Sequence, residues 1–384
     1  MYLNFTLKNL IMSSTIANRP RMHHMDVLKG MAIFMVVMGH VLTMCVREID
    51  RTTIFKFIGQ IHMPIFFFIS GWFTLKLADD VQGRRTWKIP ALLPRAKRLV
   101  IPMLFMSTLW IFYFPHSGLQ SPLDSSFHGL WFSEWKNGYW FTLVLFEIVI
   151  VYTLVAGIMG RLRNIWAQIG ATIVGWCILL AIWQMIPVET NNLLMVSLVA
   201  GFFPVFMAGA IASAHREGFH RLTQNSTAVT IALLTGAFLL YFICWPWEFD
   251  SIHITINTMS LDVEIARSLF QILLAFSGIA IVRPWCEKAF AENAPLRSHI
   301  FAHTWEYLGR ESLAIYLLHY FFLFPMWYWR PVLEDLGLSF VPCFLFSAFW
   351  AAIIIAVVLI FNRIISPSRP LSFLMAGRIS SGKA

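Results

Sequence analysis

Two ionisable side chains interrupt an apolar stretch near the start of the chain. In MDVLKGMAIFMVVMGHVLTM, residues 25–44, Lys29 lies near one end and His40 follows eleven residues later. The stretch is long enough to span a bilayer as a helix, and an ionisable side chain at membrane depth usually marks a functional site. Eleven residues make about three helical turns and a rise of about 16 Å, so the two side chains share one helix face. Histidine suits general-base chemistry near neutral pH.

Each of these two side chains also has a simpler interpretation. Asp26 precedes Lys29 by three residues, a spacing at which the two can form an ion pair on the helix surface. Lys29 by itself is typical of an interfacial lysine whose ammonium reaches water. His40 by itself is consistent with a histidine that hydrogen-bonds to a neighbouring helix. Their shared face favours a joint role over both simpler interpretations.

Four further side chains of interest lie in other apolar stretches. His62 lies in IHMPIFFFISGW, Trp140 and Glu147 lie in GYWFTLVLFE, and His319 ends LGRESLAIYLLH. A carboxylate at the depth of Glu147 needs a partner or a proton. His62 is equally compatible with a structural hydrogen bond between helices, and Trp140 with an interfacial aromatic belt. Three histidines in separate segments predict one polar cavity, but no two have i,i+4 spacing, so we expect no metal site.

A cluster of cations opens a later apolar stretch, in LLPRAKRLVIP, residues 92–102. Positive residues are typical of connections that stay in the cytoplasm, which is the plainer interpretation of this cluster. Arg95 and Arg98 are three residues apart and share a helix face, and guanidinium groups bind phosphate in a bidentate way. The cluster therefore also predicts a clamp for a phosphate-rich ligand.

The composition indicates a helical membrane protein that crosses the bilayer many times. Of the 384 residues, 58% are hydrophobic and only 13% are charged, whereas a soluble domain has about 25% charged residues. The apolar runs are continuous, which argues against the alternating strands of a β-barrel. The net charge of +9 follows from the positive-inside rule, so we expect no nucleic-acid partner. The five cysteines form no CxxC pair and are expected to be buried hydrophobes.

About ten apolar runs are long enough to cross a membrane as helices, which predicts an all-α fold. We predict spans at residues 26–46, 54–77, 99–115, 139–159, 165–187, 194–213, 227–247, 264–283, 310–330 and 340–362. Lys and Arg gather in alternate connections and in both tails, which predicts cytoplasmic N and C termini. The expected domains are a tail of residues 1–25, a transmembrane domain of residues 26–362 and a tail of residues 363–384.

Taken in order, these motifs resemble the acyltransferase-3 family of membrane proteins. The chain has D-x-x-KG from Asp26, H-M-P-x-FFF-x-SG from His62 and R-x-x-R-L from Arg95. Y-W-F from Tyr139 and G-x-x-S-L-x-IYLLH ending at His319 follow. The resemblance runs from Asp26 to about residue 362, and it is the combination of motifs that is specific, since each motif alone is weak.

The resemblance implies an O-acyltransferase that takes acyl groups from cytoplasmic acyl-CoA, a co-substrate, with no bound cofactor. The family carries a basic residue and a histidine on its first helix, which fall here on Lys29 and His40. The basic residue of that pair is usually arginine, so lysine is a departure that keeps the charge but weakens bidentate contacts. The arginine pair of the family falls on Arg95 and Arg98. The implied location is the inner, cytoplasmic membrane of a bacterium, as a multi-pass protein among membrane lipids.

These observations lead to one mechanistic hypothesis and one alternative. In the hypothesis, Lys29, Arg95 and Arg98 bind acyl-CoA, and His40 serves as a general base or carries the acyl group. Asp26, His62, Trp140, Glu147 and His319 are candidates for supporting this chemistry or for contacting the acceptor. The expected acceptor is a hydroxyl of a cell-envelope saccharide or lipid-linked glycan, and the acyl group is short, acetyl or similar. The alternative is a proton-coupled transporter of a small molecule, because buried ionisable residues also describe such carriers.

Overall fold

The computed structural model describes most of the chain between residues 22 and 378. The described residues are 22–46, 53–75, 77–79, 85–88, 90–113, 127–132, 136–224, 255–256, 259–292, 294–323, 326–337 and 339–378. The predicted span 227–247, most of the N-terminal tail and the end of the C-terminal tail lie outside these residues.

Within the part of the chain that the structure describes, seven helices are long and apolar enough to cross a membrane. They are α2 (His23–Cys45), α4 (Leu92–Tyr113), α6 (Trp140–Arg161), α7 (Ile165–Met185), α9 (Val196–Ala214), α12 (Leu261–Ala289) and α16 (Phe340–Ile365). They coincide with seven of the predicted spans, and they confirm a helical multi-pass architecture. An eighth predicted span coincides with α3 (Thr53–Thr74), whose apolar part, Ile61–Thr74, is shorter than the other seven.

Shorter elements connect these helices. The helices are α5 (Phe127–Phe132), α8 (Val188–Leu194), α10 (Arg216–Gln224), α13 (Leu296–Arg310), α14 (Ser312–Leu318), α15 (Arg330–Asp335) and α17 (Arg369–Ala376). Three 3-10 helices are η3 (Lys136–Gly138), η4 (His319–Phe322) and η5 (Met326–Trp329). Two antiparallel hairpins join β1 (Leu77–Asp79) to β2 (Arg85–Trp87) and β3 (Thr255–Ile256) to β4 (Met259–Ser260).

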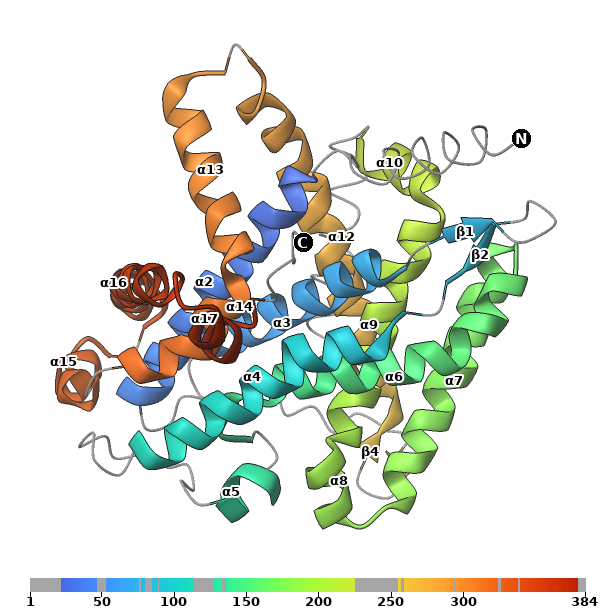
Figure 1. Cartoon of the computed structure of the whole chain (residues 1–384), viewed down its shortest axis with the longest axis horizontal. Coiled ribbons are helices and arrows are strands. Elements are labelled where there is room, and N and C mark those ends of the chain that lie inside the picture. Colours follow the sequence, from blue (N-terminus) through green and yellow to red (C-terminus); the bar gives the residue numbers. More distant parts are fainter. Residues whose placement is uncertain are drawn as a thin grey trace, which may run out of the picture.

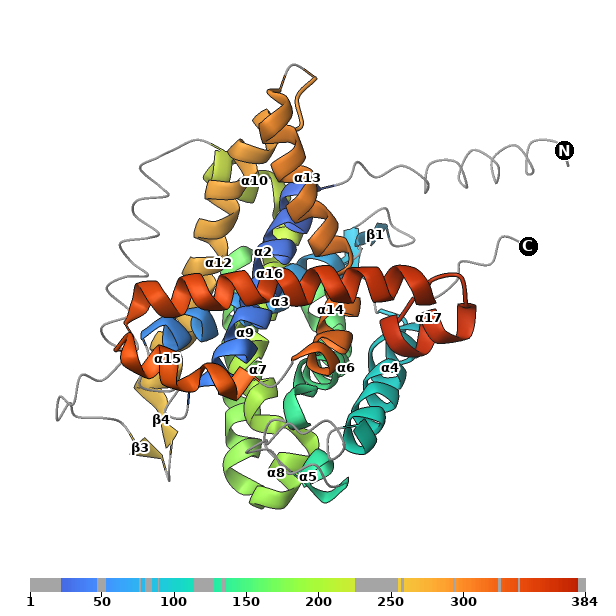
Figure 2. The same ribbon diagram turned by 90° about the vertical axis from the view of Figure 1, so that its left-hand side faces the viewer.

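Helix α2 lies in the middle of the molecule, packed between α13, α3 and α16 (Figure 1). Helix α3 packs along α9, and α4 packs along α6. The hairpin of β1 and β2 and helix α10 lie far from α5 and α15 in both views (Figures 1 and 2). Helix α17, at the end of the described chain, lies against α4 and α14 (Figure 2). The first helix is therefore enclosed by elements from distant parts of the sequence.

Glycines allow α2 to approach α13 at backbone distance. A Cβ built on Gly30 would overlap with the carbonyl oxygen of Trp305, and a Cβ on Gly309 would overlap with the carbonyl oxygen of Asp26. Small residues at helix crossings give membrane helices this close packing, since lipid supplies no hydrophobic drive for association. The same arrangement joins α3 to α9 through Gly71. The crossing at Gly309 fixes the first turns of α2, which carry Asp26 and Lys29.

We expect Gly309→Ala to destabilise the protein by about 3 kcal/mol, because the added methyl meets rigid backbone and forces α13 away from α2. A melting curve of the purified protein in detergent measures this loss. Gly157→Ala on α6 is the matched control, since nothing lies within 4 Å of its added methyl. Equal melting temperatures for the two variants would contradict the close crossing.

The predicted continuous span 310–330 is wrong. The helix ends after Leu318, the chain continues as the 3-10 helix η4, and the short helix α15 follows η5. The break begins at His319, whose Nδ1 lies 3.0 Å from the Ile315 oxygen and 2.8 Å from the Tyr316 oxygen. A side chain that binds carbonyls of its own helix competes with the backbone hydrogen bonds of the next turn. The structure also places a helix, α13, where the sequence predicted a connection.

Candidate active site

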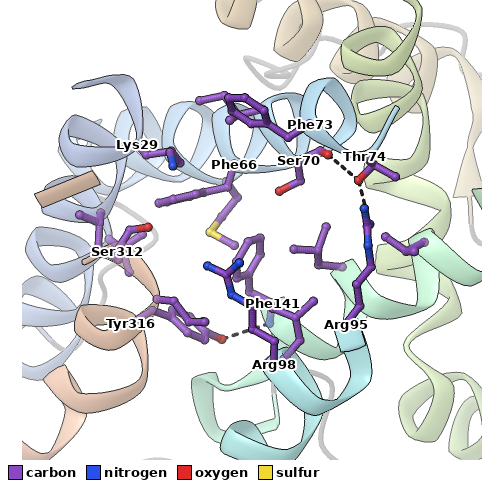
Figure 3. A pocket seen from close by; sticks show the side chains of 18 residues that line it. Lys29, Phe66, Ser70, Phe73, Thr74, Arg95, Arg98, Phe141, Ser312 and Tyr316 are labelled. Atoms are coloured by element: carbon purple, nitrogen blue, oxygen red, sulfur yellow. Dashed lines mark hydrogen bonds between the residues drawn. The ribbon is translucent and has the colours of Figure 1, made fainter. Parts of the chain in front are cut away.

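A cavity of about 400 Å³ brings together the cations that the sequence singled out. Lys29 from α2 and both Arg95 and Arg98 from α4 line it (Figure 3). Its remaining walls are mostly apolar; they are Ile33, Val36, Met63, Phe66, Ile69, Ser70, Phe73, Thr74, Leu99, Phe141, Leu145, Val149, Ser312, Leu313 and Tyr316. The cavity is thus cationic at one end and apolar beyond it.

The two arginines reach the cavity from the first turns of α4. Arg95 donates a hydrogen bond from Nη1 to the Thr74 hydroxyl over 2.9 Å, and Thr74 in turn donates to the Ser70 carbonyl over 2.6 Å. Arg95 is half-buried, whereas Arg98 is exposed. Figure 3 shows Arg95 beside Thr74 on one side of the cavity and Lys29 beside Ser312 on the other. One guanidinium is therefore fixed before any ligand binds, and the other is accessible.

Lys29 contributes less net charge than either arginine. Its Nζ lies 2.6 Å from Asp26 Oδ1, an ion pair within one helical turn, and 6.0 Å from the centre of the Phe73 ring. Because Asp26 balances the ammonium, the net positive charge of the cavity comes from Arg95 and Arg98. Lys29 still offers further N–H donors to a ligand, since an ammonium has three.

The α2 residues that line the cavity lie on the helix face that also carries His40. Lys29, Ile33 and Val36 line the cavity and are spaced four and three residues apart. His40 comes four residues after Val36, which places it on the same face about 6 Å further along the axis. The predicted alignment of Lys29 and His40 on one face of one helix therefore holds in the structure.

Three histidines lie close to one another beyond Val36, and none of them is among the described residues that line the cavity. The His40 ring centre lies 5.1 Å from the His319 ring centre, and His40 is within electrostatic range of both His319 and His62. His319 is completely buried, whereas His40 and His62 are half-buried. His62 directs its Nδ1 to the carbonyl of Ile58 in its own helix, so one of its nitrogens is occupied. The structure thus brings together histidines from α2, α3 and η4.

Glu147 and Trp140 are not part of this cavity. The α6 residues that line it are Phe141, Leu145 and Val149, and Glu147 lies two residues after Leu145, about 200° around the helix. Trp140 instead stacks on Phe202, with ring centres 5.7 Å apart.

The electrostatic neighbour of Glu147 is Lys136 rather than a histidine of the cavity. Burial lowers the pKa of Lys136 to about 8, and the charge of Glu147 opposes that shift. The Lys136 ammonium also donates to the carbonyls of Trp131 and Asn192. Glu147 therefore interacts electrostatically with Lys136 rather than with His40.

Several residues of the site were not among the predicted site residues. Thr74 and Ser312 both line the cavity; nothing local marks Thr74, whereas Ser312 is the serine of the G-x-x-S-L-x-IYLLH motif. Tyr316 lines it too, and its hydroxyl donates to the Gly138 carbonyl over 2.8 Å and accepts from the Phe141 N–H over 3.1 Å. Tyr320 places its hydroxyl 2.9 Å from His40 Nε2. The one signal for both tyrosines is their position in IYLLHY, beside His319.

Helix α17 packs against the two elements that carry Arg98 and Leu313. A Cβ on Gly377 would lie 2.8 Å from the Arg98 carbonyl and from the Leu313 side chain, so α17 ends directly against two cavity elements. Beyond it, Arg378 pairs with Glu311, which also accepts a hydrogen bond from Asn362 over 2.8 Å. The predicted C-terminal tail thus includes a docked helix.

Comparisons with known proteins identify a family and a curated relative. A family model described as an acyltransferase domain matches residues 22–361. Nodulation protein NolL of Sinorhizobium fredii is 28% identical over 307 residues, which cover 75% of this chain and 71% of NolL. No solved structure matches. The comparisons do not favour the transporter alternative.

Proposed function

Because the chain belongs to the acyltransferase-3 family of membrane acyltransferases, we propose that it moves a short acyl group from cytoplasmic acyl-CoA to a cell-envelope hydroxyl. The single observation that carries this proposal is the cavity itself. Lys29 from α2 and Arg95 from α4, 66 residues apart in the sequence, line one cavity. Its α2 wall, Lys29, Ile33 and Val36, lies on the helix face that also carries His40.

The donor fits the cavity by charge and by polarity. CoA carries phosphate groups at one end and a thioester at the other, joined by a narrow arm. Arg95 and Arg98 suit the phosphates because guanidinium groups bind phosphate through two parallel hydrogen bonds. Lys29 adds a further donor, oriented by Asp26. The arm then lies along Ile33 and Val36, which directs the thioester to His40.

His40 would perform the proton transfer. An acceptor hydroxyl gives its proton to a free nitrogen of His40 as its oxygen attacks the thioester carbonyl. The C–S bond then breaks, the thiolate takes the proton from His40, and an ester and CoA–SH are formed. In the other route, a nitrogen of His40 carries the acyl group between donor and acceptor. Both routes leave no net change in His40.

The acceptor would approach from the side of the membrane opposite the donor. We propose a saccharide or lipid-linked glycan of the envelope as acceptor and the inner membrane as location. His319 and His62 are the side chains nearest His40 that could contact the acceptor hydroxyl. Glu147 and Trp140 lie away from the cavity and would act only through the packing of α6.

Purified protein incubated with radiolabelled acetyl-CoA and an extract of envelope glycans tests the function. We expect label on a glycan together with release of free CoA. Reconstituted liposomes serve as the second arm. Movement of a solute driven by a proton gradient, without any CoA release, would contradict the proposal and support a carrier.

Thr74→Val should raise the apparent KM for acetyl-CoA about fivefold with little change in kcat, because Arg95 loses a hydrogen bond worth about 1 kcal/mol that fixes it for phosphate. Steady-state kinetics of CoA release measures both constants. Thr172→Val is the matched control, since Thr172 also bonds a carbonyl four residues back, that of Gln168, and lies on α7, which contributes none of the described residues that line the cavity. An unchanged KM in Thr74→Val would remove Arg95 from the donor site.

A further inference from the structure

A tyrosine hydroxyl occupies the edge of the His40 ring. Tyr320 Oη lies 2.9 Å from His40 Nε2 and 3.3 Å from His40 Nδ1, so it faces the ring between the two nitrogens. Tyr320 is 1% exposed. Its ring packs against Trp110 and Tyr139, with ring centres 5.7 and 5.2 Å away. A buried hydroxyl held in this way has little freedom to turn from His40.

The backbone at Gly138 faces the Tyr320 hydroxyl and leaves room for it. Gly138 has φ +89°, a left-handed conformation that favours glycine, and a Cβ there would overlap with the Tyr320 hydroxyl. Tyr316 fixes the same segment, because its hydroxyl bonds the Gly138 carbonyl and the Phe141 N–H. The position of the Tyr320 hydroxyl therefore depends on a glycine 182 residues earlier in the chain.

His319 restricts what the Tyr320 hydroxyl can do. The Nδ1 of His319 faces two carbonyl oxygens, of Ile315 and Tyr316, so in the neutral ring the proton lies on Nδ1. Its Nε2 is then an acceptor, buried and without a hydrogen-bond partner among the described residues. His319 thus offers no N–H on that side, and the hydrogen bond of Tyr320 to His40 has no competing donor from its neighbour.

We propose that Tyr320 is a positioning residue whose hydroxyl oxygen, nearer to His40 Nε2 (2.9 Å) than to Nδ1 (3.3 Å), accepts the Nε2–H and leaves the Nδ1 lone pair to take the proton of the reacting hydroxyl. Neutral imidazole has one N–H and one lone pair, so fixing one nitrogen decides which atom takes the proton. Tyr320 stays protonated throughout and touches neither substrate. This inference rests on the proposed role of His40, and it adds a residue whose one sequence signal is its position next to His319.

Tyr320→Phe keeps the ring and removes only the hydroxyl. We expect kcat for CoA release from acetyl-CoA to fall about tenfold to a hundredfold, because misplacing a catalytic group by about 1 Å has effects of that size. The KM for acetyl-CoA should stay within about twofold, since the hydroxyl is remote from the donor cations. Gly138→Ala displaces the same hydroxyl without deleting it and should lower kcat in the same way. Tyr113→Phe is the control, because its hydroxyl donates to the Phe321 carbonyl, 3.3 Å away in η4, the 3-10 helix that also carries Tyr320.

A second readout does not depend on turnover. Diethyl pyrocarbonate modifies accessible imidazole nitrogens, and peptide mass spectrometry follows His40 alone. We expect His40 in Tyr320→Phe to react about fivefold faster than in the wild type, which corresponds to a lost hydrogen bond of about 1 kcal/mol. If acetyl-CoA is not the donor, the wild type shows no turnover, yet this difference persists and still supports the positioning role. A His40 modification rate equal to that of the wild type overturns the proposal, whatever the kinetics show.

Discussion

His40→Ala should lower kcat for acyl transfer about a thousandfold while the protein remains folded. General-base catalysis contributes about a hundredfold to ten-thousandfold, and His40 is the histidine in line with the cavity wall of Lys29 and Val36. The KM for acyl-CoA should change little, because the donor cations are untouched. CoA release and label transfer from acetyl-CoA, measured together, report this loss.

His40→Gln refines the same experiment. Glutamine retains polar atoms that can bond Tyr320 but has no nitrogen able to take a proton near neutral pH, so we expect it to be as inactive as alanine. His215→Ala is the control, since His215 also makes a side-chain hydrogen bond, to Gln168 Oε1 at 2.9 Å. His215 is not one of the residues that line the cavity. Full activity in a folded His40→Ala protein would remove His40 from the chemistry.

The two routes through His40 are separable by a trapping experiment. Wild-type protein given acetyl-CoA without acceptor should gain an acetyl group on the His40 peptide if the imidazole carries the acyl group. A general base leaves that peptide unmodified and releases CoA only slowly, by hydrolysis. Mass spectrometry after acid quenching distinguishes these outcomes, and His40→Gln shows which signal belongs to His40.

The architecture was largely predictable from sequence because hydropathy is a local property. Long apolar runs must satisfy their backbone inside the bilayer, so a helix is the expected result wherever such a run occurs. The break at His319 was not predictable in this way, since SLAIYLLHYFFLF is apolar on both sides of the histidine. There the side chain of His319 binds the carbonyls of Ile315 and Tyr316, and only the structure shows that competition.

In the candidate site too, features within one helix were predictable from the sequence, whereas features that depend on packing between helices were not. The alignment of Lys29 with His40 depends on one helix, so the spacing alone predicted it. The joining of Lys29 with Arg95 and Arg98 depends on how α2 and α4 pack, and the sequence offered only charge as a hint. Glu147 was singled out for its depth in an apolar run, but depth does not reveal which side of α6 it occupies.

Arg95→Ala combined with Arg98→Ala should raise the KM for acetyl-CoA about a hundredfold to ten-thousandfold with kcat nearly unchanged. Each guanidinium can form charge-assisted hydrogen bonds to phosphate, worth about 1.5–3 kcal/mol apiece. The thioester end of the donor would still meet an intact His40 once bound, so the chemical step keeps its rate. Steady-state kinetics over a wide range of acetyl-CoA concentration separates the two constants.

The rival explanation for these arginines is topology, because positive residues also hold a connection in the cytoplasm. Lys97→Ala provides the matched control: it removes one cation from the same helical turn, and Lys97 is exposed and absent from the cavity wall. We expect its KM to change less than about twofold. The paired change Arg95→Lys with Arg98→Lys keeps both charges and should recover only part of the affinity, since lysine does not bind phosphate in a bidentate way.

Acetyl-pantetheine, a donor without the nucleotide and its phosphates, completes the argument. If the arginines bind phosphate, the wild type and the double alanine variant should use this truncated donor with the same kcat/KM, because neither can make the missing contacts. If instead the double variant is also impaired towards acetyl-pantetheine, then Arg95 and Arg98 support the fold of the cavity rather than the charge of the donor. The ratio of kcat/KM for acetyl-pantetheine between the wild type and the double variant therefore shows whether Arg95 and Arg98 bind the donor or support the structure of the cavity.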